Sequence, residues 1–119
     1  MRQIIYYRTP SGRSPVEQFV GGLLPKQRGK IGWVLGVVRT SDRVPAEYLK
    51  KLAGTDGLWE VRAAYGGDAF RLLCFFDAGN LVVLLTAFAK KTEDTPLLEI
   101  ELAQQRRRDY LSRKVENGG

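Results

Sequence analysis

Branched and aromatic residues dominate residues 58–91, which two turn-forming stretches, residues 66–67 and 77–80, divide into three segments. This pattern predicts three antiparallel strands in a meander. The last segment, residues 81–89, is apolar except for Thr86, which suits a central strand that is buried on both faces.

A two-residue loop at Gly66 and Gly67 would fix the pairing of the first two strands, with Tyr65 opposite Asp68 and Arg62 opposite Arg71. One face of this hairpin is then apolar and is predicted to join the core: Val61, Ala63, Tyr65, Phe70, Leu72, Cys74 and Phe76. The other face carries Glu60, Arg62, Ala69 and Arg71.

Two arginines directly opposite each other on a sheet repel, at a cost of roughly a few tenths of a kcal/mol when solvated. A requirement of folding does not explain this pair, whereas a binding site for a polyanion does. The alternative is a solvated face on which Glu60 makes a cross-strand ion pair, and a longer loop would shift the register and remove the opposition.

Other patterns place the remaining elements. A β-type run at residues 3–7 predicts a first strand, and Ser14 and Pro15 predict the start of a short helix. A second helix is expected over residues 25–39, with its apolar stripe at Ile31, Val34, Leu35 and Val38. Residues 40–48 are expected to form a loop, and residues 49–52 to lead into a turn at 54–57.

The last helix is expected to begin with Thr95 as its N-cap and Pro96 as its first residue, and residues 116–119 are expected to fray. The predicted order is β-α-α-β-β-β-α. We therefore expect one α+β domain over residues 1–119, with a small, mostly antiparallel twisted sheet. Two N-terminal helices pack on one face, and a C-terminal helix closes the chain and has freedom to move.

The charge balance favours a polyanionic partner. The chain has 19 lysine and arginine residues against 13 acids, a net charge of +6, with no histidine and a single cysteine. Without histidine the commonest general acid/base and metal ligand are missing, so neither a metal site nor a cofactor is expected. Cys74, in a predicted strand, is expected to be a buried thiol in a reducing cytoplasm. No apolar run approaches the ~18 residues of a membrane span.

Several basic residues admit two interpretations. Lys26, Arg28 and Lys30 in the early turns of the second helix form either a solvated face or an edge that contacts a nucleic-acid backbone. In the last helix, acids come early and bases late, as the helix dipole favours. The arginine run that contains Arg106 and Arg107 is therefore either structural or RNA-binding.

The polar sheet face carries groups that suit chemistry on a phosphate: Glu60, Arg62, Arg71 and, at the end of the last strand, Lys90 and Lys91. Arginine forks bind phosphate and stabilise charge that develops at phosphorus. A carboxylate among them can orient the arginines or accept a proton. Cleavage of RNA by its own 2′-hydroxyl needs a base, cations and an acid, and requires no metal, cofactor or histidine.

Three stretches resemble the RelE/ParE toxin superfamily, and most closely its HigB-like, phage-derived host-killing branch. They are LWEVR at residues 58–62, FRLLCFF at 70–76 and FAKKTEDTPLLEIELA at 88–103. The most specific part is Phe-x-Lys-Lys-Thr-x-x-Thr-Pro-x-x-Glu-Ile at residues 88–100. The resemblance covers nearly the whole chain.

The resemblance implies the toxin of a type II toxin–antitoxin pair, a ribonuclease that enters the ribosomal A site and cuts mRNA. It also implies a helix-turn-helix antitoxin, HigA-like, which binds the toxin and represses the operon. Arg62 and Arg71 match cationic positions around the scissile phosphate, and Lys91 matches a basic position after the last strand.

The sequence also departs from the family pattern. Glu60 stands where RelE has a basic residue, so it is either a general base or an arginine-orienting residue. The tyrosine that some relatives place after the last strand is missing. Lys50, Lys51 and Lys90, with Arg106 and Arg107, are candidates for RNA contacts. Two other functions remain open: a ParE-like inhibitor that binds DNA gyrase, and a degenerate toxin that binds only its antitoxin.

Overall fold

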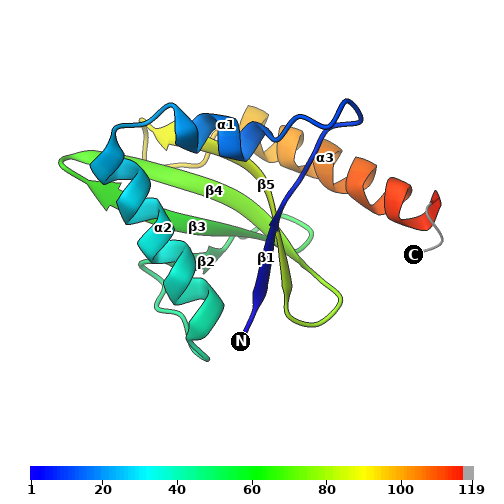
Figure 1. Ribbon diagram of the computed structural model, residues 1–119, viewed down its shortest axis with the longest axis horizontal. Helices are drawn as coiled ribbons and strands as arrows, with labels where there is room; N and C mark the ends of the chain where they lie inside the picture. The colour runs from blue at the N-terminus through cyan, green and yellow to red at the C-terminus, as the bar shows by residue number, and fades with distance from the viewer. Residues whose placement is uncertain (117–119) are drawn as a thin grey trace.

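The computed structural model describes residues 1–116, in which five strands form one sheet and three helices pack on it (Figure 1). The strands are β1 (Gln3–Tyr6), β2 (Leu49–Lys51), β3 (Leu58–Tyr65), β4 (Asp68–Asp77) and β5 (Leu81–Lys90). The helices are α1 (Pro15–Gly21), α2 (Pro25–Thr40) and α3 (Leu97–Glu116). The α+β fold class is confirmed. Fraying was expected from residue 116, but α3 continues through Glu116, and residues 117–119 lie outside the described residues.

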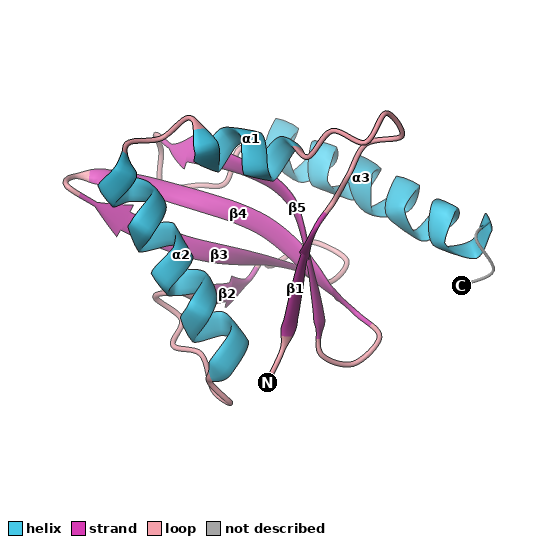
Figure 2. Ribbon diagram, viewed as in Figure 1, coloured by secondary structure: helices cyan, strands magenta, loops and turns pink. Residues whose placement is uncertain are grey.

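The strands lie in the order β1-β5-β4-β3-β2, and all neighbours are antiparallel except β1 and β5, which are parallel (Figure 2). Strand β5 is therefore interior, and Val82 to Leu85 are fully buried. Alternate side chains of this strand join opposite cores, Val82 and Leu84 on one side and Val83 and Leu85 on the other. The prediction of a central strand buried on both faces is confirmed.

The predicted register of the β3–β4 hairpin is confirmed, with Tyr65 opposite Asp68 and Arg62 opposite Arg71. Gly66 and Gly67 both have positive φ, 61° and 88°, as a type I′ two-residue loop requires. One prediction for this hairpin was wrong: the Tyr65 side chain was expected in the core, but it is 40% exposed at the tip of the hairpin.

Each face of the sheet has its own core. Helices α1 and α2 cover one side, where Val16, Ile31 and Val34 pack against the apolar hairpin face that the sequence predicts. Helix α3 covers the other side, where Ala103 and Ile100 belong to a second apolar cluster. Cys74 is fully buried, and burial raises the pKa of its thiol to about 12. None of the helices within residues 1–116 is both long and apolar enough to cross a bilayer.

Strand β2 is an element that the sequence pattern missed. Leu49–Lys51 pairs antiparallel with the edge of β3, although these residues were expected only to lead into a turn. Three residues are too few to show a period of two, so the strand is specified by the β3 edge beside it. Other differences are small: the short N-terminal helix ends at Gly21, and α3 begins at Leu97, one residue after Pro96.

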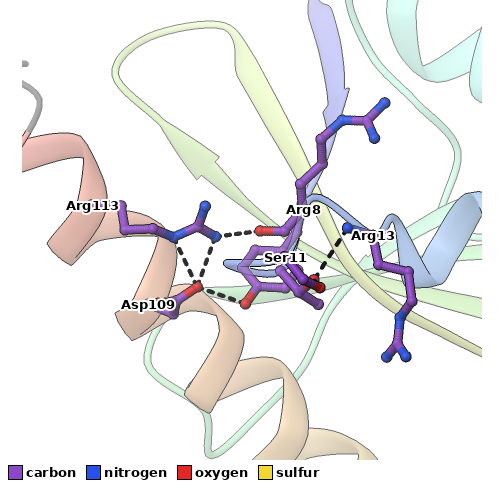
Figure 3. Close-up of polar contacts among 7 residues, drawn as sticks. Arg8, Ser11, Arg13, Asp109 and Arg113 are labelled. Atoms are coloured by element: carbon purple, nitrogen blue, oxygen red, sulfur yellow. Dashed lines mark hydrogen bonds and ion pairs between the residues drawn. The ribbon is translucent and has the colours of Figure 1, made fainter.

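Helix α3 is held to the sheet by polar contacts along its second half (Figure 3). Asp109 Oδ2 accepts hydrogen bonds from the Tyr7 hydroxyl at 2.6 Å and from Arg113 Nη2 at 2.7 Å, and Arg113 also donates to the Arg8 carbonyl. One turn away, Asp77 Oδ2 accepts from the Tyr110 hydroxyl at 3.0 Å and from Lys114 Nζ at 2.9 Å. In this structure α3 is a docked helix.

We predict that Asp109→Asn weakens α3 docking most at neutral pH. Hydrogen bonds from Tyr7 and then Arg113 hold the pKa of the Asp109 carboxyl below its ordinary value. The stabilisation is therefore present above the unfolded-state pKa, about 3.9 for aspartate, and is lost as pH falls through the folded-state pKa. Urea unfolding at pH 7 and pH 2.5 should show a stability gap between wild type and variant that shrinks in acid.

The matched control is Asp42→Asn, which removes an exposed carboxylate from the loop after α2. It should leave the urea midpoint close to that of the wild type at both pH values. A gap for Asp109→Asn that is the same at both pH values would contradict an electrostatic role for this carboxylate.

Candidate functional site

The opposed arginines lie on the α3 side of the sheet, in the half of the β3–β4 hairpin nearer its turn. Arg62 on β3 and Arg71 on β4 are direct partners, and Phe88 on β5 continues the row. The Arg71 side chain is 8% exposed and that of Arg62 is 27% exposed. The site therefore contains one enclosed guanidinium and one that reaches solvent.

Glu60 holds the two arginines together. Its Oε1 lies 3.3 Å from Arg71 Nε and 3.6 Å from Arg62 Nε, and its side chain is only 6% exposed. A buried carboxylate between two guanidinium groups offsets their mutual repulsion and leaves the trio with one net positive charge. Folding thus accommodates the like-charge pair through a third residue on the adjacent row of the sheet.

The second carboxylate oxygen of Glu60 is also engaged. Thr95, which precedes α3, donates from Oγ1 to Glu60 Oε2 at 2.6 Å. The segment that joins β5 to α3 therefore reaches back to β3 and encloses the trio. Of the two roles predicted for Glu60, this geometry favours orientation of the arginines, because a role as general base would require the Thr95 hydrogen bond to break.

Burial lowers the pKa of the Arg71 guanidinium, and the charge of Arg62 lowers it further, while Glu60 and then Glu93 act in the opposite direction. Arg71 Nη1 also donates to the carbonyl of Phe70 at 3.0 Å. These contacts fix the guanidinium in place before any ligand arrives, which is what electrostatic preorganisation requires.

A pocket of about 320 Å³ adjoins the arginines at the edge of β3. The Arg62 amide donates to the Tyr48 carbonyl at 2.8 Å, at the start of β2, and beyond this point Ala63 and Ala64 line the pocket. Its lining comes from both sides of the sheet: Lys30, Glu47, Tyr48, Arg62, Ala63, Ala64, Ala69 and Arg71. The guanidinium groups can thus be approached from this edge.

The structure brings some of the other predicted site residues to the arginines. Lys50 on β2 is the direct partner of Glu60, so its exposed side chain lies on the α3 side of the sheet. Lys90 is opposite Ala69, one row beyond Arg71 on the same side. Lys91 is exposed directly after β5, on the segment that leads to Thr95. Lys51 pairs with Trp59, and its side chain lies on the opposite side of the sheet.

Arg106 and Arg107 are half-buried, and both direct their guanidinium groups to residues of the sheet and its loops. Arg106 Nη1 donates to the Leu85 carbonyl at 2.9 Å, and the Arg106 guanidinium lies 5.9 Å from the centroid of the Tyr7 ring. Arg107 lies 4.9 Å from the Phe75 ring centroid and donates to the Asp56 carbonyl. Of the two interpretations of this arginine run, the contacts favour the structural one.

Sequence reasoning missed several residues that the site contains. Thr95 was expected only to cap a helix, and the pocket residues Glu47 and Tyr48 were assigned to a loop. Trp33, which packs against the pocket residue Tyr48, could have been identified from the sequence, because it falls outside the apolar stripe of α2 and is accordingly 53% exposed. For the others no local signal exists, since their neighbours are far away in the sequence.

The fold and site define a class of protein: a small α+β domain, compatible with a RelE-like fold, with a cationic sheet face. The family model described as Phage derived protein Gp49-like (DUF891) matches residues 18–108, from α1 into α3, and includes the whole arginine site. The chain belongs to this Gp49-like family. A search of curated proteins found no match.

We predict that Glu60→Ala destabilises the fold strongly. Removing one partner of a buried ion pair leaves uncompensated charge in the interior, at a cost of about 3–5 kcal/mol. Urea unfolding should show this loss, and a Glu60→Ala, Arg71→Met double variant should recover part of it.

The matched control is Glu101→Ala, which removes an exposed glutamate from α3. A Glu60→Ala protein as stable as this control would contradict the proposed electrostatic role of Glu60 in the fold.

Proposed function

We propose that the chain is the toxin of a type II toxin–antitoxin system, an endoribonuclease that cleaves mRNA during translation in the cytoplasm. The observation that carries the proposal is the fixed pair of arginines, Arg62 and Arg71, held by Glu60 beside a pocket that opens to solvent. Membership of a RelE-like, toxin-type family supports it, as does the net charge of +6.

In the proposed reaction the 2′-oxygen of a ribose attacks the adjacent phosphorus as it loses its proton, and the bond to the 5′-oxygen of the next nucleotide breaks. The products are a 2′,3′-cyclic phosphate and a 5′-hydroxyl, with the proton from the 2′-oxygen lost to a base and one gained by the leaving oxygen. Negative charge gathers on the phosphoryl oxygens in the transition state. Preorganised arginine donors stabilise such charge more than they stabilise the ground state.

The two arginines divide this work according to their exposure. Arg62 reaches solvent, and within the described residues its terminal nitrogens make a single long hydrogen bond, 3.4 Å, to the Ala46 carbonyl, so Arg62 has donors available for a phosphate. Arg71 is enclosed and supplies fixed positive charge behind Arg62. Lys50, Lys90 and Lys91 surround the pair and would hold the flanking RNA backbone.

The same proposal includes a helix-turn-helix antitoxin that binds this chain and, through that complex, operator DNA. Two other functions would give different phenotypes. An inhibitor of DNA gyrase would damage DNA and leave RNA intact, and a degenerate toxin would arrest nothing.

We predict that Arg62→Ala and Arg71→Ala each lower mRNA cleavage by about 100-fold or more, because each removes a group that stabilises the phosphoryl charge. The measurement is a map of mRNA 5′ ends after induction of each protein in cells. Wild type should give new ends inside translated frames, with growth arrest, and the variants should give few.

Arg39→Ala, which removes an exposed arginine from the last turn of α2, is the matched loss of charge and should cut like wild type. Circular dichroism and urea unfolding must show that each variant is folded, with Arg62→Ala the decisive one because its side chain is partly exposed. Growth arrest with intact mRNA would contradict the nuclease and point to gyrase.

A further inference from the structure

An exposed aromatic cluster lies beside the arginine pocket. Trp33 on α2 is 53% exposed, and its ring packs edge-to-face against Tyr48, with centroids 5.4 Å apart and planes at 78°. Lys30 Nζ lies 4.5 Å from the Trp33 ring centroid and 5.8 Å from that of Tyr48. The buried side chains of α2, such as Ile31 and Val34, lie elsewhere on the helix, so about half of the Trp33 surface remains open to a ligand.

This cluster is continuous with the cationic pocket. Lys30 and Tyr48 line the same pocket as Arg62 and Arg71, so an aromatic ring and guanidinium groups share one cavity of about 320 Å³. That volume is at the lower end of the range of small-molecule sites, about 300–1,000 Å³, and suits a ligand of nucleotide size. The charged lining residues are three cations and one carboxylate, Glu47, which gives the pocket a positive balance.

Arg62 lines this pocket and has unused hydrogen-bonding capacity at its terminal nitrogens. Its Nε is buried against Glu60, 3.6 Å from Oε1, so a ligand in the pocket would not reach that atom. A guanidinium carries five N–H donors, and within residues 1–116 the Arg62 side chain donates a single hydrogen bond, the long contact to the Ala46 carbonyl. An anion at the pocket would meet a donor group that the fold leaves largely unsatisfied.

We propose that this pocket is a nucleotide subsite. It holds the base of the nucleotide next to the scissile phosphate against Tyr48 and Trp33, and it holds the phosphate of that nucleotide between Lys30 and Arg62. The inference rests on the proposed ribonuclease function and names how its substrate is held. Every base has a π-face that stacks on aromatic rings, and Lys30 complements the adjoining phosphate, so cations and aromatic rings in one pocket favour RNA over an acidic protein segment.

The first test measures stacking directly. Wild-type protein is titrated with a fluorescein-labelled pentanucleotide whose 2′-positions are O-methylated, which prevents cleavage. A second pentanucleotide lacks the central base. Trp33→Ala should weaken binding of the complete oligomer about tenfold, within the range measured for loss of one base–aromatic contact. It should change binding of the abasic oligomer little, whereas Lys30→Gln should weaken both.

Two further variants separate stacking from folding. Trp33→Phe keeps an aromatic ring and should restore most of the affinity, while Leu98→Ala removes an apolar side chain that is 78% exposed on α3 and should change nothing. Equal loss of affinity for both oligomers in Trp33→Ala, or no loss for either, would overturn the stacking subsite.

The second test distinguishes failure of the proposed subsite from failure of the proposed nuclease function. Trp33→Ala and wild type are compared by the 5′-end map in cells. Lower cleavage by Trp33→Ala supports the subsite. If wild type cleaves mRNA and Trp33→Ala cleaves it at the same rate and positions, the subsite is overturned and the proposed nuclease function is retained. Absence of cleavage by wild type overturns the nuclease and the subsite together.

Discussion

The carboxylate of Glu60 is the contact on which the site depends. It meets Arg71 on β4 and Arg62 on its own strand through one oxygen, and Thr95 ahead of α3 through the other. These contacts join the central strands to the connection that closes the domain. Without the carboxylate, two opposed guanidinium groups would repel each other in a region with little water to screen them. The sheet can therefore display a concentrated positive charge only because Glu60 is buried with it.

The many arginines of the chain fall into two groups with different physical roles. Arg106, Arg107 and Arg113 direct their guanidinium groups to backbone carbonyls, and so fasten α3 to the sheet and to nearby loops. Arg62 has few partners of its own and faces a pocket. Structural arginines are thus distinguished from those available to a ligand by whether their N–H donors already have acceptors in the fold, and not by clustering in the sequence.

Enclosure of the trio has a consequence for the chemistry. Arg71 is largely shielded by the surrounding structure, whereas Arg62 lies between that enclosed region and the open edge of β3. A phosphate at the edge would contact Arg62 directly. The charge of Arg71 would attract it across the protein interior, where electrostatic interactions are screened less than in water. The same burial makes each member of the trio important for stability, so effects on activity must be read beside effects on folding.

The sequence by itself determined the hairpin register, because two glycines with positive φ permit a type I′ loop and that loop fixes which residues face each other. It also determined the interior position of β5 through an apolar run that only Thr86 interrupts. Both features follow from local conformational preference and the period-two alternation of strands.

Only the tertiary structure decided the rest. The pairing of β2, the return of Thr95 to Glu60 and the lining of the pocket by Lys30, Tyr48, Arg62 and Arg71 join residues from different elements, from 8 positions apart for Lys51 and Trp59 to 41 for Lys30 and Arg71. No period or motif records such contacts. They arise when the helices and strands pack, because the burial of each group then depends on neighbours from other elements.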